Sequence, residues 1–251
     1  MIDRRFKLMN TNIDNLTMKE ALEEINELLN DGKYHFIVTP NLDHIVKLEV
    51  DAELQEVYQS ADLILTDGTP LIWISKLYKK PIVEKISGSD LFPKVCELAA
   101  KEHYKIFLLG AMEGVAIKAA INLRKKYDGL QIVGTFSPPF GFDKDEGAIN
   151  QIIEMINAAK PDILAVGLGA PKQEKFIFKY KDQLKVPLSL AIGATIDFEA
   201  GSVKRAPKWM QNIGLEWFYR LLKEPRRMYK RYLMDGVYIF PIFLKYFKSD
   251  K

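Results

Sequence analysis

Short apolar segments alternate with segments of helical periodicity along most of this chain, and this alternation constrains its fold most strongly. Six such segments are each followed within three residues by glycine or proline, as expected for strands buried in a parallel sheet. Helical segments separate them, which is typical of a parallel sheet covered by helices on both faces. We therefore predict an α/β fold with strands at 35–38, 63–65, 105–109, 131–136, 162–167 and 187–192.

Local signals place several ends of these elements. Residues 4–16 predict a short strand pair, and Thr17 with Glu20 predicts a capping box at the start of the next helix. The sequence Thr66-Asp67-Gly68 ends the strand at 63–65, and Pro70 suits the first turn of a helix. A helix is also predicted from about residue 144 to 159.

Charge divides the chain near Gly201. Residues 203–251 hold twelve Lys/Arg and four Asp/Glu, a net charge of +8, so the rest carries −5 of the overall +3. We predict a catalytic body at 1–201 and a basic, aromatic, helical appendage at 202–251 that faces an anionic partner. The single cysteine, Cys96, lies in an apolar run, and no His/Cys cluster has the spacing of metal ligands.

The end of the appendage is unusually apolar. Residues 238–247 are almost wholly aliphatic and aromatic, with Lys245 and Lys248 among or beside them. This pattern favours a helix that lies in a membrane interface, although a helix packed on the body or in a subunit contact would have the same composition. We find no secretory signal and no apolar run of membrane-spanning length. Nucleic-acid binding is disfavoured because the aromatic residues cluster among aliphatic ones.

Polar side chains follow four of the predicted strands. Because right-handed crossovers bring these loops to one edge of a parallel sheet, we expect the side chains to converge there. Short hydroxyl, amide and carboxylate groups suit an uncharged sugar with many hydroxyls. The residues concerned are Thr39 and Asn41, Asp67, Gln173 with Glu174, and Asp197.

Each of these features also has a simpler explanation. Asp67 could only support the turn before Gly68, and His44 could be a partly buried histidine rather than half of an acid–base pair with Asp43. Lys85 could contact a phosphate or lie in solvent. The loop at 169–174 could bind a diphosphate at a helix N-terminus, although it has neither a Walker spacing nor a dinucleotide fingerprint.

Taken together, the motifs resemble those of the WecG/TagA/CpsF family of bacterial glycosyltransferases over residues 12 to about 231. The matching pieces are Thr39-Pro40-Asn41, Thr66-Asp67-Gly68, Ser87-Gly88-Ser89-Asp90-Leu91, Gly169-Ala170-Pro171-Lys172-Gln173-Glu174, Val203-Lys204-Arg205-Ala206-Pro207 and Gly214-Leu215-Glu216-Trp217-Phe218-Tyr219-Arg220-Leu221. Their order and spacing make the resemblance specific.

The resemblance implies a Rossmann-like fold and an inverting, metal-independent transferase without a cofactor. Such an enzyme moves a sugar, here N-acetylmannosamine, from a UDP donor to a polyprenyl-diphosphate-linked saccharide in cell-wall, teichoic-acid or surface-polysaccharide synthesis. It would be cytoplasmic and peripheral at the inner face of the cell membrane, and a homo-oligomer is possible.

The resemblance also implies roles for particular residues. Asp67 corresponds to the proposed general base, and Asp197 to a residue near the nucleotide. The sugar pocket would be lined by Thr39, Asn41 and Gln173. Appendage arginines Arg220, Arg227 and Arg231 would close over the diphosphate. The family often has Arg at the position of Lys85, and only Arg would bind a phosphate through two parallel hydrogen bonds.

Elementary chemistry agrees with this assignment. The acceptor hydroxyl loses a proton as it attacks the anomeric carbon, and a positioned carboxylate can take it. Cationic groups can stabilise the leaving diphosphate. Three alternatives stay open: a UDP-glucose or UDP-uronic acid donor, a non-catalytic nucleotide-sugar-binding scaffold at the membrane, and a nicotinamide-dependent oxidoreductase, which the missing fingerprint glycines disfavour.

Overall fold

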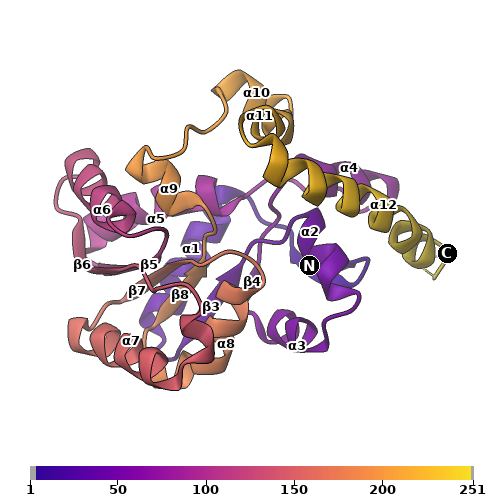
Figure 1. Cartoon of the computed structure of the whole chain (residues 1–251). Helices are drawn as coiled ribbons and strands as arrows, with labels where there is room; N and C mark the ends of the chain where they lie inside the picture. The colour runs from indigo at the N-terminus through magenta and orange to yellow at the C-terminus, as the bar shows by residue number, and fades with distance from the viewer. Residues whose placement is uncertain (1–3, 250–251) are drawn as a thin grey trace.

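A six-stranded parallel sheet forms the centre of the molecule (Figure 1). The computed structural model describes residues 4–249, apart from the side chains of 212, 227, 230–235 and 249. The strand order is β4-β3-β8-β7-β5-β6, and each neighbouring pair is parallel. The strands are β3 (His35–Val38), β4 (Leu63–Ile64), β5 (Lys105–Gly110), β6 (Gln131–Phe136), β7 (Ile163–Gly167) and β8 (Leu188–Ala191). The predicted α/β fold is confirmed.

Alternate side chains of each strand enter two separate apolar cores, one on each face of the sheet. In β3, Phe36 and Val38 enter one core and Ile37 enters the other, as the two-residue period of a strand requires. The first core is covered by α2 (Leu42–Leu48), α3 (Ala52–Ser60), α4 (Thr69–Leu77), α7 (Glu146–Ala159) and α8 (Lys172–Leu184). The second is covered by α1 (Met18–Asn30), α5 (Gly88–Glu102), α6 (Val115–Lys126) and α9 (Thr195–Ala200).

A small antiparallel pair, β1 (Arg5–Leu8) and β2 (Thr11–Asp14), lies beside β4. Asp14 fixes this pair, because its carboxylate accepts two hydrogen bonds from Arg5 at 2.7 Å and one from the Ile64 backbone N–H at 2.7 Å. The predicted capping box is present, since the Thr17 and Glu20 side chains each accept the other's backbone N–H. Both predictions for this region are confirmed.

The helix predicted from residue 144 begins later. A short 3₁₀ turn, η1 (Phe142–Lys144), precedes α7, which begins at Glu146. Asp145 caps α7 by accepting the Ala148 N–H at 3.1 Å, and this hydrogen bond decides where the α-helix begins.

The appendage contains α10 (Lys208–Asn212), α11 (Glu216–Lys223) and the long α12 (Pro225–Ser249). Figure 1 shows α10 and α11 above the carboxyl edge of the sheet, with α12 running from them across α2 and α4. The turn before α11 fits closely on the body, because a Cβ atom at Gly214 would lie 2.6 Å from Thr69 Cγ2. The appendage is therefore seated directly on the start of α4, just after the loop that follows β4.

One face of α12 packs on the body. Ile242 is buried in the first core, and the rings of Phe243 and Phe247 lie edge-on to Tyr78, with centroids 5.5 and 5.4 Å away. The opposite face is exposed and apolar, with Phe240 64% exposed and Leu244 38% exposed. Within residues 4–249, no helix combines the length and the apolar character needed to span a bilayer. The apolar segment thus has both a body-packing face and an exposed face.

Candidate active site

A pocket of about 360 Å³ lies between the carboxyl edge of the sheet and the appendage. Its body side includes residues that follow β3 and β4 or lie just before or at the start of α5, among them Asn41, Asp67, Trp73, Lys85, Ser87 and Ser89. Its appendage side includes Gln211, Gly214, Glu216, Trp217, Arg220 and Gly236. Open α/β sheets bind ligands at this edge, and the volume falls within the usual range for small-molecule sites. Both parts of the chain are needed to enclose it.

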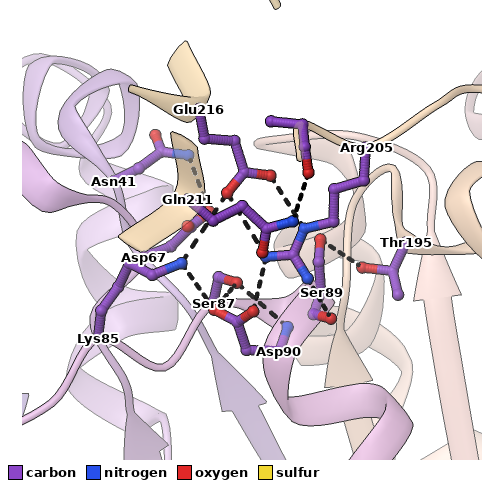
Figure 2. A network of polar contacts seen from close by, with 11 residues as sticks. Asn41, Asp67, Lys85, Ser87, Ser89, Asp90, Thr195, Arg205, Gln211 and Glu216 are labelled. Atoms are coloured by element: carbon purple, nitrogen blue, oxygen red, sulfur yellow. Dashed lines mark hydrogen bonds and ion pairs between the residues drawn. The ribbon is translucent and has the colours of Figure 1, made fainter. Parts of the chain in front are cut away.

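Asp67 lies on the pocket wall directly after β4. Its backbone N–H donates to the Pro40 carbonyl at 2.8 Å, which joins the loops that follow β3 and β4. Its Oδ2 lies 3.5 Å from the Asn41 Nδ2, as Figure 2 shows, and Oδ1 has no hydrogen-bond partner among the described residues. Burial raises the pKa of Asp67, the nearby carboxylates of Glu216 and Asp90 raise it further, and Lys85 opposes them. A carboxylate with a raised pKa and one free oxygen can accept a proton.

Behind Asn41 lies a buried polar cluster that does not line the pocket. His44 Nδ1 is 2.9 Å from Asn41 Oδ1, and His44 Nε2 is 3.2 Å from Glu174 Oε1. Glu174 also accepts from Gln173 Nε2 at 2.7 Å, and Gln173 Oε1 accepts the Gly193 N–H at 3.0 Å. Burial opposes ionisation of Glu174, but hydrogen bonding and charge from His44 outweigh it, so its pKa is lowered.

Two predicted sugar-binding residues do not lie on the pocket surface. Thr39 is 8% exposed and Gln173 is 4% exposed, and the pocket lining includes neither. Gln173 hydrogen-bonds within the buried cluster, so in this structure it supports the pocket from behind. Asn41, by contrast, lines the pocket.

Asp197 also lies away from the pocket lining. It is in the first turn of α9, where its backbone carbonyl accepts the N–H groups of Ser202 and Val203. Its neighbour Phe198 is the α9 residue that lines the pocket.

A charged network joins the body to the appendage (Figure 2). Arg205 donates to Asp90 Oδ1 at 2.6 Å, to Glu216 Oε1 at 3.0 Å and to the Ser89 carbonyl at 3.0 Å. Lys85 lines the pocket; it donates to Asp90 Oδ2 at 2.7 Å and lies 3.9 Å from Glu216 Oε2. Lys85 is therefore already paired with two carboxylates, and a bound phosphate would compete with them.

Of the three predicted appendage arginines, Arg220 lines the pocket. Its Nε is buried and has no hydrogen-bond partner among the described residues. A buried guanidinium nitrogen without a partner is costly, so this group is suited to an anionic ligand. Arg227 and Arg231 lie on α12, but their side chains are outside the part of the chain that is described.

Known proteins with similar sequences identify the family of this chain. The sequence profile described as "Glycosyl transferase WecG/TagA/CpsF family" matches residues 6–251. The chain belongs to this family. It is accordingly a glycosyltransferase, as the motifs predicted.

Three relatives have the same printed name, N-acetylglucosaminyldiphosphoundecaprenol N-acetyl-beta-D-mannosaminyltransferase. The protein from Bacillus spizizenii (strain ATCC 23059 / NRRL B-14472 / W23) is 33% identical over 211 residues, covering 84% of this chain and 79% of that protein. The one from Bacillus subtilis (strain 168) is 34% identical over 201 residues, covering 80% and 75%. The one from Staphylococcus aureus (strain MW2) is 29% identical over 223 residues, covering 88% and 85%.

The acidic and metal-ligating side chains of this family member are dispersed or already paired. Among the described residues, no group of three or more His, Cys, Asp or Glu side chains could hold a metal ion. The chain has one Asp-x-Asp sequence, at Asp143 and Asp145, which sequence reasoning overlooked. Asp143 accepts from Lys172 Nζ at 2.8 Å and Asp145 caps α7, and neither lines the pocket.

Sequence reasoning on this glycosyltransferase also missed the charged clamp, by which we mean Arg205 with its partners Asp90 and Glu216. Arg205, Glu216 and Asp90 were recognised only as parts of motifs. The signal that could have found them is the change in charge near residue 201, because a basic segment returning to an acidic body needs specific anionic partners. The helix-capping role of Asn41 and the pairing of His44 with Glu174 were equally unassigned.

Proposed function

We propose that this enzyme transfers N-acetylmannosamine from a UDP donor to an undecaprenyl-diphosphate-linked N-acetylglucosamine, with inversion and without a metal ion. The observation that carries this proposal is the pocket in which Asp67, from the body, and Arg220, from the appendage, line the same space. The printed names of the three relatives support the sugar and the lipid-linked acceptor.

The reaction divides between the two sides of the pocket. The acceptor hydroxyl attacks the anomeric carbon, a new C–O bond forms, and the bond to the UDP oxygen breaks from the opposite face. Asp67 Oδ1 accepts the hydroxyl proton, and Arg220 stabilises the charge that develops on the leaving diphosphate. In this proposal Lys85 supports the diphosphate, whereas Asn41 orients the base. Arg227 and Arg231 remain proposed diphosphate contacts from α12.

The exposed face of α12 supports an acceptor presented at the inner face of the cytoplasmic membrane. Phe240 and Leu244 are apolar and exposed, and Lys248 lies at the end of the same helix. Such a helix can rest in the interfacial region of an anionic bilayer. In sedimentation with anionic liposomes, the pair Phe240→Gln and Leu244→Gln should abolish binding, whereas Ile117→Gln, an exposed residue on α6, should not. If both variants sediment equally with the liposomes, this face of α12 does not contact the membrane.

The donor and acceptor are tested together by measuring UDP release. Purified enzyme should release UDP from UDP-N-acetylmannosamine only when a lipid-diphosphate N-acetylglucosamine acceptor is added, in the presence of excess chelator. Release from UDP-glucose or a UDP-uronic acid instead would reassign the donor. Donor binding by calorimetry without any release would favour a non-catalytic scaffold, and loss of activity in chelator would disprove metal independence.

A further inference from the structure

A chain of hydrogen bonds runs from the pocket surface into the body and connects the base to three other strand ends. It leads from Asp67, after β4, through Asn41, after β3, to His44 and then to Glu174, at the start of α8 after β7. Gln173 extends it to the Gly193 N–H, after β8. The loops that create the site are thus tied together beneath its surface.

We propose that Glu174 and His44 are positioning residues, which orient the Asn41 amide so that it holds Asp67 Oδ2 and leaves Oδ1 free for the acceptor hydroxyl. This inference rests on the proposed function of Asp67 as the base. Glu174 and His44 are 1% and 4% exposed and do not line the pocket, so they cannot act by touching the substrate. Any effect they have on transfer must pass through Asn41.

The orientation of the Asn41 amide follows from its neighbours. Asn41 Oδ1 accepts the Asp43 N–H at 3.1 Å as the cap of α2, and only an oxygen can do so. The amide nitrogen is therefore directed at Asp67. His44 Nδ1 lies 2.9 Å from the same Oδ1 and 3.3 Å from the Asn41 backbone nitrogen, whose N–H it faces in the capping box of α2, so the imidazole packs against both ends of Asn41 and holds the residue in place.

Glu174 in turn holds the imidazole. Its Oε1 is the partner of His44 Nε2, which fixes the ring between Asn41 on one side and α8 on the other. A carboxylate this deeply buried needs such a partner, because removing one member of a buried pair leaves an uncompensated charge. Tyr58 packs beside His44, with ring centroids 6.2 Å apart, but its buried hydroxyl has no hydrogen-bond partner among the described residues. Tyr58 is therefore next to the chain of hydrogen bonds without belonging to it.

The first test uses a near-isosteric change, Glu174→Gln, with Tyr58→Phe as the matched control. Glu174→Gln should lower kcat by about 100-fold, the size expected when a reacting group is misplaced by a fraction of its contact distance, and leave the KM for the UDP donor within about twofold. Tyr58→Phe should change neither. A fall in donor affinity with unchanged kcat would overturn the proposal.

A double-mutant cycle asks whether Glu174 acts through Asn41. Asn41→Ser keeps a helix cap but lacks the amide that reaches Asp67, so it should also lower kcat by about 100-fold. Because both changes remove the same interaction, the double variant should be no slower than Asn41→Ser alone. Losses that multiply would overturn the proposal.

A readout without substrate separates this inference from the proposed reaction. In ¹⁵N-labelled protein, Glu174→Gln should shift the side-chain amide resonance of Asn41, and Tyr58→Phe should not. An unchanged Asn41 resonance in folded Glu174→Gln protein overturns the positioning role even if the enzyme transfers sugar. A shifted resonance in a wild-type protein that transfers nothing would instead refute only the proposed function.

Discussion

The two walls of the pocket are held in different ways. On the body side, Asp67 and Asn41 are fixed by backbone and side-chain hydrogen bonds among loops that leave the sheet. On the appendage side, the contacts are ion pairs between partly exposed groups, with Arg205 between Asp90 and Glu216. Hydrogen bonds shielded from water are little affected by salt, whereas partly exposed ion pairs are weakened by salt and by competing anions. The body side is thus built to hold a base still, and the appendage side to respond to charge.

The strongest way to break the body side is to remove the base. Asp67→Asn should lower kcat by about two to four orders of magnitude, the usual worth of general-base catalysis, with donor KM nearly unchanged. Since burial makes ionised Asp67 costly, the melting temperature of this variant at pH 7 should be at least that of the wild type. Near-wild-type transfer by the folded variant would refute the assignment.

The second-largest loss of activity should come from removing Arg220 on the appendage side. Arg220→Ala should lower kcat by about 100-fold, because a preorganised donor facing the leaving diphosphate is lost. Lys223→Ala, on the same helix but outside the pocket lining, is the control and should retain activity. Initial rates of UDP release at saturating donor test this, and equal losses in the two variants would point to a general defect of α11.

The pH dependence of kcat/KM tests the two walls together, because charged groups on both of them shift the pKa of Asp67. Burial, Glu216 and Asp90 raise its pKa, so kcat/KM should fall about tenfold per unit as pH drops through a value above the ordinary 3.9 or so. Lys85 lowers this pKa, so Lys85→Met should move the acidic limb to higher pH. If the acidic limb of the pH profile is unchanged in Lys85→Met, the group that titrates is not Asp67.

The smallest effect should come from the clamp itself. Arg205→Ala leaves Asp90 and Glu216 without their shared cation and should cost about 1–2 kcal/mol of unfolding free energy, after allowance for partial exposure. It should also make residues 201–215 more sensitive to protease, and raise the KM for the donor more steeply as salt is added. The control is Lys204→Ala, a change at the adjacent exposed residue. If Arg205→Ala and Lys204→Ala respond identically, the clamp does not hold the appendage to the body.

Local sequence chemistry predicted what depends on neighbours in the chain. Strand periodicity gave the parallel sheet, Thr17 and Glu20 gave the first cap, and the turn after β4 gave the position of Asp67. Convergence of Asn41 with Asp67 followed from the topology of a parallel sheet, which brings strand ends together whatever their separation in sequence.

Long-range choices of partner could not be predicted in this way. Nothing near Glu174 in the sequence indicates that His44, 130 residues earlier, will face it. Thr39 and Gln173 were expected on the pocket surface because strand-end loops face the ligand, yet the depth of each side chain depends on packing between helices. The same holds for Arg205, whose partners depend on how the appendage is seated.

That the pocket is bounded by both parts of the chain has a consequence for finding inhibitors. A compound that fills it must contact Asp67 and Arg220 together, so its binding also stabilises the contact between the appendage and the body. Screening against a shortened protein that ends near residue 201 would discard the appendage side of the pocket, six of its eighteen lining residues, and select the wrong molecules.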